Sequence, residues 1–192
     1  RPPPMMGIYR RAVRPLLFRL DPEWVHNAAI SLGHAVGRLG AAAAVRTLYG
    51  VSDPRLRQRF GALDFANPVG LAAGFDKNGK AGRALAAGGF GSVEGGSVSA
   101  HSSSGNAMSP RLFRLPADEA IVVYYGVPND GALTVSRRLA RAGLGVPLGV
   151  NLVETNSGRP VAVDDVIAEF TDAARAFVGV ADYLSLNLNC PN

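Results

Sequence analysis

Residues 67–79, NPVGLAAGFDKNG, join a short apolar run to a group of polar side chains. The run at 67–74 predicts a short strand, because it is brief and bounded by turn-forming residues. Asp76, Lys77 and Asn78 follow directly at its end. This stretch therefore predicts a strand whose carboxyl end carries functional groups.

Further short apolar runs lie at 89–98, 120–125, 146–152 and 181–188, and helical patterns lie between several of them at 80–87, 132–142 and 163–178. Strands that alternate with helices indicate βαβ units and a parallel sheet. Polar side chains again follow the strands, among them Ser97, Asn151 and Asn187. Functional groups at the carboxyl ends of parallel strands are typical of a (β/α) barrel. The polar stretch 99–110 is too long for a tight turn and is predicted to cover a site.

Residues 1–50 have a helical pattern instead. Asp21, Pro22 and Glu23 predict a helix start, with an N-cap acid, a proline in the first turn and a second acid near the positive end of the dipole. Gly40 offers a stop, and Pro15 is predicted to break or kink an earlier helix. One face of the second helix carries an apolar stripe of Val25, Ala29, Leu32, Val36 and Leu39.

The stripe permits two interpretations: the helices pack on the protein's own core, or they lie on a membrane. Five arginines precede the first acid, Asp21, and apolar residues lie between them. A basic, apolar segment suits an anionic membrane surface. The segment has no uncharged run of ~18 residues that would span a bilayer, and it lacks the pattern of a secretory signal. These residues alone leave both interpretations open.

The composition is that of an ordinary globular protein: 192 residues, 47% hydrophobic and 18% charged, with a net charge of +5. A single cysteine excludes an internal disulfide, and one cysteine with three scattered histidines predicts no zinc site. Neither the dinucleotide-binding glycine pattern nor a Walker motif occurs, so those nucleotide sites are not expected.

Several motifs, taken together and in this order, closely resemble dihydroorotate dehydrogenase of the quinone-reducing, membrane-associated class 2: YRRAVRPLLFRLDPEWVH (9–26), NPVGLAAGFDKNG (67–79), GFGSVEGGSVS (89–99), PRLFRLPADEAI (110–121), LGVNL (148–152) and NLNCPN (187–192). The resemblance implies an α/β fold, a (β/α)8 TIM barrel with FMN. About its first half would occupy residues 51–192, after a helical segment at 1–50 that forms a quinone tunnel.

The family oxidises (S)-dihydroorotate to orotate in pyrimidine biosynthesis and passes the electrons to a quinone. The resemblance favours the membrane interpretation: peripheral contact through residues 1–40, on the cytoplasmic face of a bacterial inner membrane. It implies no nucleic-acid partner. Because only about half a barrel is present, the 192 residues alone are expected to be inactive and to bind no FMN.

The resemblance also assigns residues. It implies FMN contacts for Ala73, Gly74, Lys77, Ser97, Asn151 and Asn187, substrate contacts for Lys77, Asn187 and Asn192, and the catalytic base for Cys190. An amide offers a donor and an acceptor together, which suits the edge of a pyrimidine ring. A thiolate can accept a proton when neighbouring groups lower its pKa. The alternatives are a solvated surface lysine at 77 and a buried structural cysteine at 190.

The sequence departs from the family pattern in two places. Class 2 enzymes usually have serine where this chain has Cys190. The family's substrate-binding asparagine is replaced by Val123, which cannot hydrogen-bond and is followed by Tyr124 and Tyr125. We therefore also consider a related flavoprotein with an altered substrate, a truncated remnant without activity and, with least support, an RNA-modifying flavoenzyme.

Overall fold

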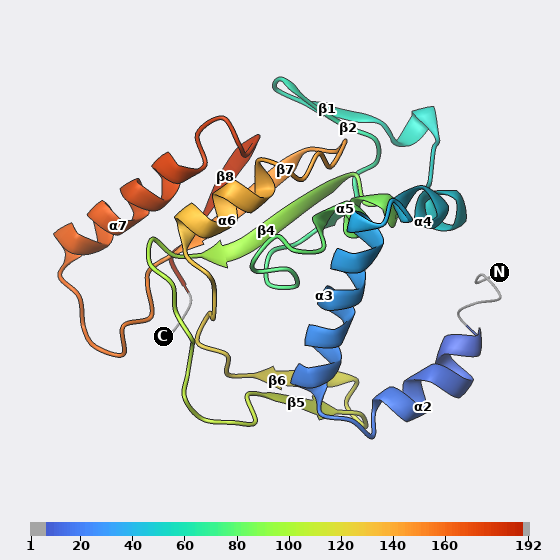
Figure 1. The fold of residues 1–192 in the computed structure, drawn as a ribbon, viewed down its shortest axis with the longest axis horizontal. Helices are drawn as coiled ribbons and strands as arrows, with labels where there is room; N and C mark the ends of the chain where they lie inside the picture. The colour runs from blue at the N-terminus through green and yellow to red at the C-terminus, as the bar shows by residue number, and fades with distance from the viewer. Residues whose placement is uncertain (1–6, 190–192) are drawn as a thin grey trace.

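The computed structural model describes residues 7–189 and contains a parallel α/β layer with helices of the N-terminal segment beside it (Figure 1). The main sheet has four parallel strands in the order β3-β4-β7-β8. These strands are Gly70–Leu71, Ser92–Val98, Leu148–Val153 and Tyr183–Asn187. Helices α5 (Gly82–Ala87), α6 (Ala132–Leu139) and α7 (Val163–Ala176) lie between them along the chain. The predicted alternation of strands and helices is confirmed for these segments.

The hydrophobic core lies between the sheet and these three helices. Val150 and Leu152 of β7 are fully buried there, together with Val135 of α6 and Phe177 at the end of α7. Because side chains alternate across a strand, the residue between the two β7 core positions, Asn151, faces the other side of the sheet. One face of the sheet is therefore apolar and packed, and the other is free to carry polar groups.

The apolar run at 120–125 forms a strand, as predicted, but it does not join this sheet, so the predicted place of that strand in the parallel sheet is wrong. Strand β6 (Ala120–Val123) pairs antiparallel with β5 (Leu112–Leu115) in a separate hairpin. Only residues 116–119 connect the two strands, and such a short connection permits an antiparallel hairpin but no crossover to a parallel strand. The hairpin crosses the base of the molecule in Figure 1, near the start of α3.

The N-terminal segment is helical, as predicted, but Pro15 does not break its first helix. A π-helical turn η1 (Tyr9–Val13) leads directly into α2 (Arg14–Leu17), with Pro15 in the first turn of α2. The Arg14 N–H donates to the Tyr9 carbonyl, five residues earlier. Because proline has no N–H, the helix accommodates it by a change of hydrogen-bond register rather than by ending.

Helix α3 (Pro22–Arg38) begins and ends where the sequence predicts. The Trp24 N–H donates to the Asp21 carboxylate at 2.8 Å, which caps the start. Gly40 has a φ of +75° at the other end, and the Ala41 N–H donates to the Val36 carbonyl, which completes a glycine-based stop. Helix α4 (Ala42–Tyr49) follows, bent by 108° from α3.

The apolar stripe of α3 does not pack on the protein's core. Leu32 is 67% exposed and Leu39 is 83% exposed. A different face approaches α5: a Cβ on Gly33 would lie 2.8 Å from the Ala81 Cβ, and a Cβ on Gly37 would lie 3.1 Å from the Arg83 Cβ. Glycines thus allow close packing on one side of α3 while the larger apolar residues lie on the other.

The remaining elements are short: a 3-10 turn η2 (Pro54–Leu56) and a hairpin of β1 (Gln58–Phe60) and β2 (Leu63–Phe65). Within residues 7–189, no single helix has both the length and the apolar composition needed to cross a bilayer. Helices α3 and α4 meet these two criteria only when they are taken together, as a bent pair.

Candidate active site

A cleft of about 720 Å³ lies where the loop after β3, the ends of β4 and β8, and the β5–β6 hairpin meet. Its volume is in the usual range for a small-molecule site. Five of the residues singled out from the sequence line it: Ala73, Gly74, Lys77, Ser97 and Asn187. The structure thus brings together side chains that are up to 114 positions apart in the chain.

The floor of the cleft is a row of hydrogen-bonded polar side chains from three neighbouring strands. The Ser97 hydroxyl donates to the Asn151 amide oxygen, and the Asn187 amide donates to the Ser97 hydroxyl at 3.5 Å. The Asn151 amide in turn donates to the Ser185 hydroxyl at 2.8 Å. Asn151 therefore lies beneath the cleft and holds Ser97, rather than lining the cleft itself.

The row continues toward the other end of the sheet through Glu94. Its carboxylate accepts hydrogen bonds from the Ser185 hydroxyl and, at 3.4 Å, from the Tyr183 hydroxyl. Burial, reinforced by the Glu94 charge, raises the pKa of Tyr183 above its ordinary value of 10.0. Tyr183 is therefore a neutral donor at physiological pH.

At Gly74 the backbone faces the cleft without a side chain. Its φ is +103°, which disfavours any side chain, and no atom lies within 4 Å of the position that a Cβ would take. Its N–H donates to the Gly96 carbonyl at 2.7 Å, which ties the loop to the end of β4. A flat ring could approach this backbone closely, whereas a Cβ would project into the open space.

Lys77 lies at the junction of this cleft and a second, smaller cavity of about 240 Å³. Its ammonium group donates to the Gly74 carbonyl at 2.7 Å and lies 4.7 Å from the centre of the Tyr125 ring. His26 and Phe75 also line both cavities and meet edge to face at 5.2 Å. Burial, and next the charge of Lys77, lower the pKa of His26 below 6.5. The histidine is therefore neutral at physiological pH, and the lysine carries the local positive charge.

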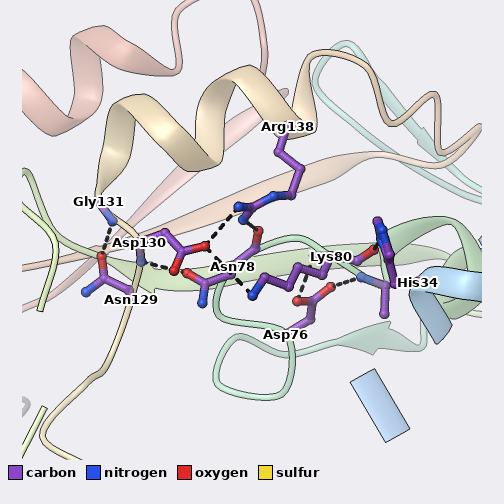
Figure 2. A network of polar contacts seen from close by, with 9 residues as sticks. His34, Asp76, Asn78, Lys80, Asn129, Asp130, Gly131 and Arg138 are labelled. Carbon is purple, nitrogen blue, oxygen red and sulfur yellow. Dashed lines mark hydrogen bonds and ion pairs between the residues drawn. The ribbon is translucent and has the colours of Figure 1, made fainter. Parts of the chain in front are cut away.

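The turn that carries Lys77 is held by a buried carboxylate (Figure 2). Asp76 is only 2% exposed, and its two oxygens accept the N–H groups of Lys80 at 2.9 Å and Ala81 at 2.6 Å. This caps the turn that precedes α5, so the backbone on both sides of Lys77 is fixed.

A second set of contacts in Figure 2 joins the same turn to the start of α6. The Asp130 N–H donates to the Asn78 side chain at 2.8 Å, and Arg138 bridges the Asn78 carbonyl and the Asp130 carboxylate. Asn129 is 5% exposed, and its side-chain oxygen accepts the Gly131 N–H at 2.9 Å. The lysine turn is thus anchored to two helices.

Comparison with known proteins agrees with this geometry. A sequence model of the dihydroorotate dehydrogenase family matches residues 55–192. The chain belongs to the dihydroorotate dehydrogenase family. It is 45% identical over 184 residues to the dihydroorotate dehydrogenase (quinone) of Acidithiobacillus ferrooxidans, which covers 94% of this chain and 49% of the relative. It is 43% identical to the enzyme of the same name from Gloeobacter violaceus, over 97% of this chain and 52% of the relative.

A crystal structure of the Eimeria tenella dihydroorotate dehydrogenase in complex with ferulenol superposes with a TM-score of 0.71 at 33% identity, covering 90% of this chain and 45% of that one. The parallel strands and their helices are therefore part of the barrel-type fold of the dihydroorotate dehydrogenases. The chain spans about half the length of the curated relatives it matches.

The β5–β6 hairpin carries Val123, where the family resemblance predicts a substrate-binding asparagine. Val123 lines the cleft and is 48% exposed, so an apolar side chain stands at this wall of the cleft. Tyr124 and Tyr125 also line the cleft, and the Tyr125 hydroxyl is buried and has no hydrogen-bond partner within the described residues.

Arg111 is a support residue that the sequence analysis did not single out. Its guanidinium pairs with both oxygens of Glu23 from α3 and donates to the Ser104 and Asn106 carbonyls at 2.9 and 3.2 Å. It lies 5.4 Å from the centre of the Tyr125 ring. The hydrogen-bonded Glu23 carboxylate raises the pKa of Arg111 above its ordinary value. Arg111 lies within the PRLFRLP motif, but its partner is 88 positions away, so the motif alone could not reveal the pair.

The predicted catalytic base Cys190 and the predicted substrate residue Asn192 lie outside the described residues, and their roles stay predictions. Asp76 and Asn129 were visible in the sequence only as polar residues after a strand or as parts of a family motif. In the structure both side chains are buried, and this burial shows that they support the site. Burial depends on tertiary packing, so the sequence did not reveal it.

Proposed function

We propose that the polypeptide carrying this chain, at the full length of its relatives, oxidises (S)-dihydroorotate to orotate in de novo pyrimidine biosynthesis. FMN would be its cofactor and a quinone its electron acceptor. The observation that carries the proposal is the single cleft lined by Ala73, Gly74, Lys77, Ser97 and Asn187 in a chain of this family.

The residues present fit a flavin. The open backbone at Gly74 allows a flat ring to approach, and Ser97 and Asn187 offer hydrogen-bonding groups at one edge of the same space. Lys77 supplies a cation suited to an electron-rich ring and to a substrate carboxylate. When bound, FMN would accept a hydride from C6 of dihydroorotate.

The chain's own groups would bind the substrate and move a proton. Lys77 would bind the carboxylate, and the Asn187 and Asn192 amides would hold the edge of the pyrimidine ring. Cys190, as a thiolate, would remove the proton from C5, so that the C5–H bond breaks while the C5–C6 double bond forms. A cysteine has an ordinary pKa of about 8.5, and a neighbouring positive charge would favour the thiolate.

The test uses the full-length polypeptide loaded with FMN and mixed with dihydroorotate without oxygen. Flavin absorbance and orotate formation are followed together. We expect Cys190→Ala to slow flavin reduction by about 10²–10⁴-fold, the range for loss of a positioned base, and Cys190→Ser to retain more activity. Undiminished reduction in Cys190→Ala would contradict the assignment, and absence of orotate with bound FMN would contradict the reaction.

A second candidate is a related flavoprotein oxidoreductase with an altered substrate, and Val123 at the cleft supports it. Loss of one hydrogen bond to a polar ring edge costs about 1–3 kcal/mol. If dihydroorotate is the substrate, Val123→Asn should lower its KM. If Val123→Asn leaves the KM for dihydroorotate unchanged or raises it, the result supports the candidate with an altered substrate.

We also propose that residues 1–40 contact a membrane peripherally, on the cytoplasmic face of a bacterial inner membrane. Exposed Leu16, Leu32 and Leu39 near several arginines support this. In the full-length polypeptide, Leu32→Ser with Leu39→Ser should weaken co-sedimentation with anionic vesicles. Leu133→Ser, a comparably exposed residue on α6, serves as the control and should not. Equal loss in both variants would contradict the proposal.

A further inference from the structure

A small, strongly basic pocket lies between α3, α5 and the end of α6. Its volume is about 160 Å³. Five cationic side chains line it, together with His34: Arg38, Lys80, Arg83, Arg138 and Arg141. Among the described residues, none of those predicted to bind the flavin or the substrate lines this pocket, so it is separate from the cleft.

Few acids balance these cations. Figure 2 shows one Asp130 oxygen shared by two of them, the Arg138 guanidinium at 2.8 Å and the Lys80 ammonium at 3.9 Å. Asp76 also lies nearby, but its oxygens are occupied by backbone N–H groups. Five cations therefore face two carboxylates, in a chain whose total net charge is only +5.

The remaining arginines have donors to spare. Arg38 and Arg141 are exposed and form no ion pair within residues 7–189. Arg83 donates its Nε and Nη2 groups to the Ala142 and Arg141 carbonyls, which fixes its guanidinium at the rim. Its Nη1 group has no hydrogen bond within the described part of the chain.

Close backbone packing gathers these charges. Gly37 of α3 lies against Arg83, and a Cβ on Gly82 would lie 3.1 Å from Leu144. Like charges held in a concave site repel one another, and the walls focus their field into the pocket. A bound anion would relieve that repulsion. Guanidinium groups suit a phosphate in particular, because their N–H pairs match two of its oxygens.

We propose that this pocket binds an anionic phosphate group, carried either by a soluble phosphate compound or by a phospholipid headgroup. Arg38 and Arg141 would bind the phosphate from two sides, and Arg83 and Lys80 would supply further donors. Binding does not depend on the flavin or on dihydroorotate oxidation, so failure of one proposal leaves the other intact.

The test measures binding of inorganic phosphate to the full-length polypeptide by calorimetry at constant ionic strength. We expect Arg38→Gln with Arg141→Gln to weaken binding by about 25-fold, on the order of fivefold for each arginine. The control is Arg46→Gln with Arg137→Gln, which removes the same charge from two exposed arginines outside the pocket. The control should bind like the unaltered protein.

A second arm uses vesicles of phosphatidylcholine and phosphatidylglycerol in equal amounts. Vesicle binding that falls in the pocket variant but not in the control, and that inorganic phosphate competes away, identifies a lipid headgroup. Phosphate binding without vesicle binding identifies a soluble ligand. The proposal is overturned if the pocket variant and the control lose binding equally, or if the unaltered protein binds neither probe. Thermal melting of both variants should match that of the unaltered protein, because all four substituted side chains are exposed.

Discussion

The Lys77 ammonium lies 4.7 Å from the centre of the Tyr125 ring, and the Arg111 guanidinium lies 5.4 Å from the same centre. One aromatic ring thus links two cations. Because Arg111 also pairs with Glu23, the contacts run from α3 to the lysine of the cleft. The ring, rather than the hydroxyl, makes this link, since the hydroxyl is buried and has no partner within the described residues.

The first prediction separates the ring from the hydroxyl. Tyr125→Leu removes a cation–π contact of about 0.5–2 kcal/mol, so orotate affinity should fall roughly two- to thirtyfold in the full-length polypeptide. Tyr125→Phe keeps the ring and should bind orotate like the unaltered protein. Orotate titration followed by flavin absorbance measures both, and equal weakening in the two variants would contradict the role of the ring.

The second prediction concerns the backbone wall of the cleft. Gly74→Ala forces a side chain into a positive φ and puts a methyl group into the space proposed for the flavin. Gly61 also has a positive φ and open surroundings, but it lies in the β1–β2 turn. Both substitutions should lower the melting temperature: Gly61→Ala through left-handed strain of about 1–2 kcal/mol, and Gly74→Ala by at least as much, because its φ of +103° lies outside that region. Only Gly74→Ala should weaken FMN binding, as measured by flavin fluorescence. Similar FMN affinity in the two variants would contradict a flavin site against the Gly74 backbone.

The third prediction concerns the buried carboxylate under Lys77. Asp76→Ala leaves the Lys80 and Ala81 N–H groups without acceptors, and each buried unsatisfied group costs about 1–3 kcal/mol. The free energy of unfolding of the full-length polypeptide, measured with urea, should fall by about 2–4 kcal/mol. Asp118 is exposed, so Asp118→Ala should change it by less than about 0.5 kcal/mol. A loss no larger in Asp76→Ala than in this control would mean that the cap contributes little.

The fourth prediction is a pH dependence. Burial lowers the pKa of His26 below 6.5 in the folded protein, so below pH 6.5 the unfolded chain binds more protons than the folded one. The stability from neutral His26 is complete above pH 6.5 and is lost as the pH falls from 6.5 toward the folded pKa. Urea denaturation at pH values on both sides of 6.5 measures the free energy of unfolding. Between the higher and the lower pH, this free energy should fall less in His26→Gln than in the unaltered protein. An equal fall in the two proteins would exclude His26 as the source of the pH dependence.

The fifth prediction concerns residues 1–192 expressed alone. Strand β8 pairs only with β7 among the described residues, and Leu184, Leu186 and Leu188 are 40%, 59% and 76% exposed. An unpaired strand edge with apolar side chains promotes association. We expect no cooperative urea transition and no FMN binding by circular dichroism and flavin fluorescence. A soluble monomer that melts cooperatively with bound flavin would contradict this.

Local patterns predicted much of the fold. The caps at Asp21 and Gly40 act within one helical turn, and the sheet strands alternate with helices as the apolar runs indicate. The error at 120–125 arose because apolar content alone does not distinguish a sheet strand from a hairpin strand. The length of the connection before it, residues 116–119, would have distinguished the two.

The sequence by itself determined the alternation of the parallel strands with α5, α6 and α7, the caps of α3 and the family motifs, because each depends on neighbouring residues. Only the tertiary structure decided which face of α3 packs on the protein, how Arg111 reaches Glu23, and that five cations gather at one pocket. Those outcomes depend on contacts between residues tens of positions apart. Their energies come from packing and burial, which a linear pattern does not record.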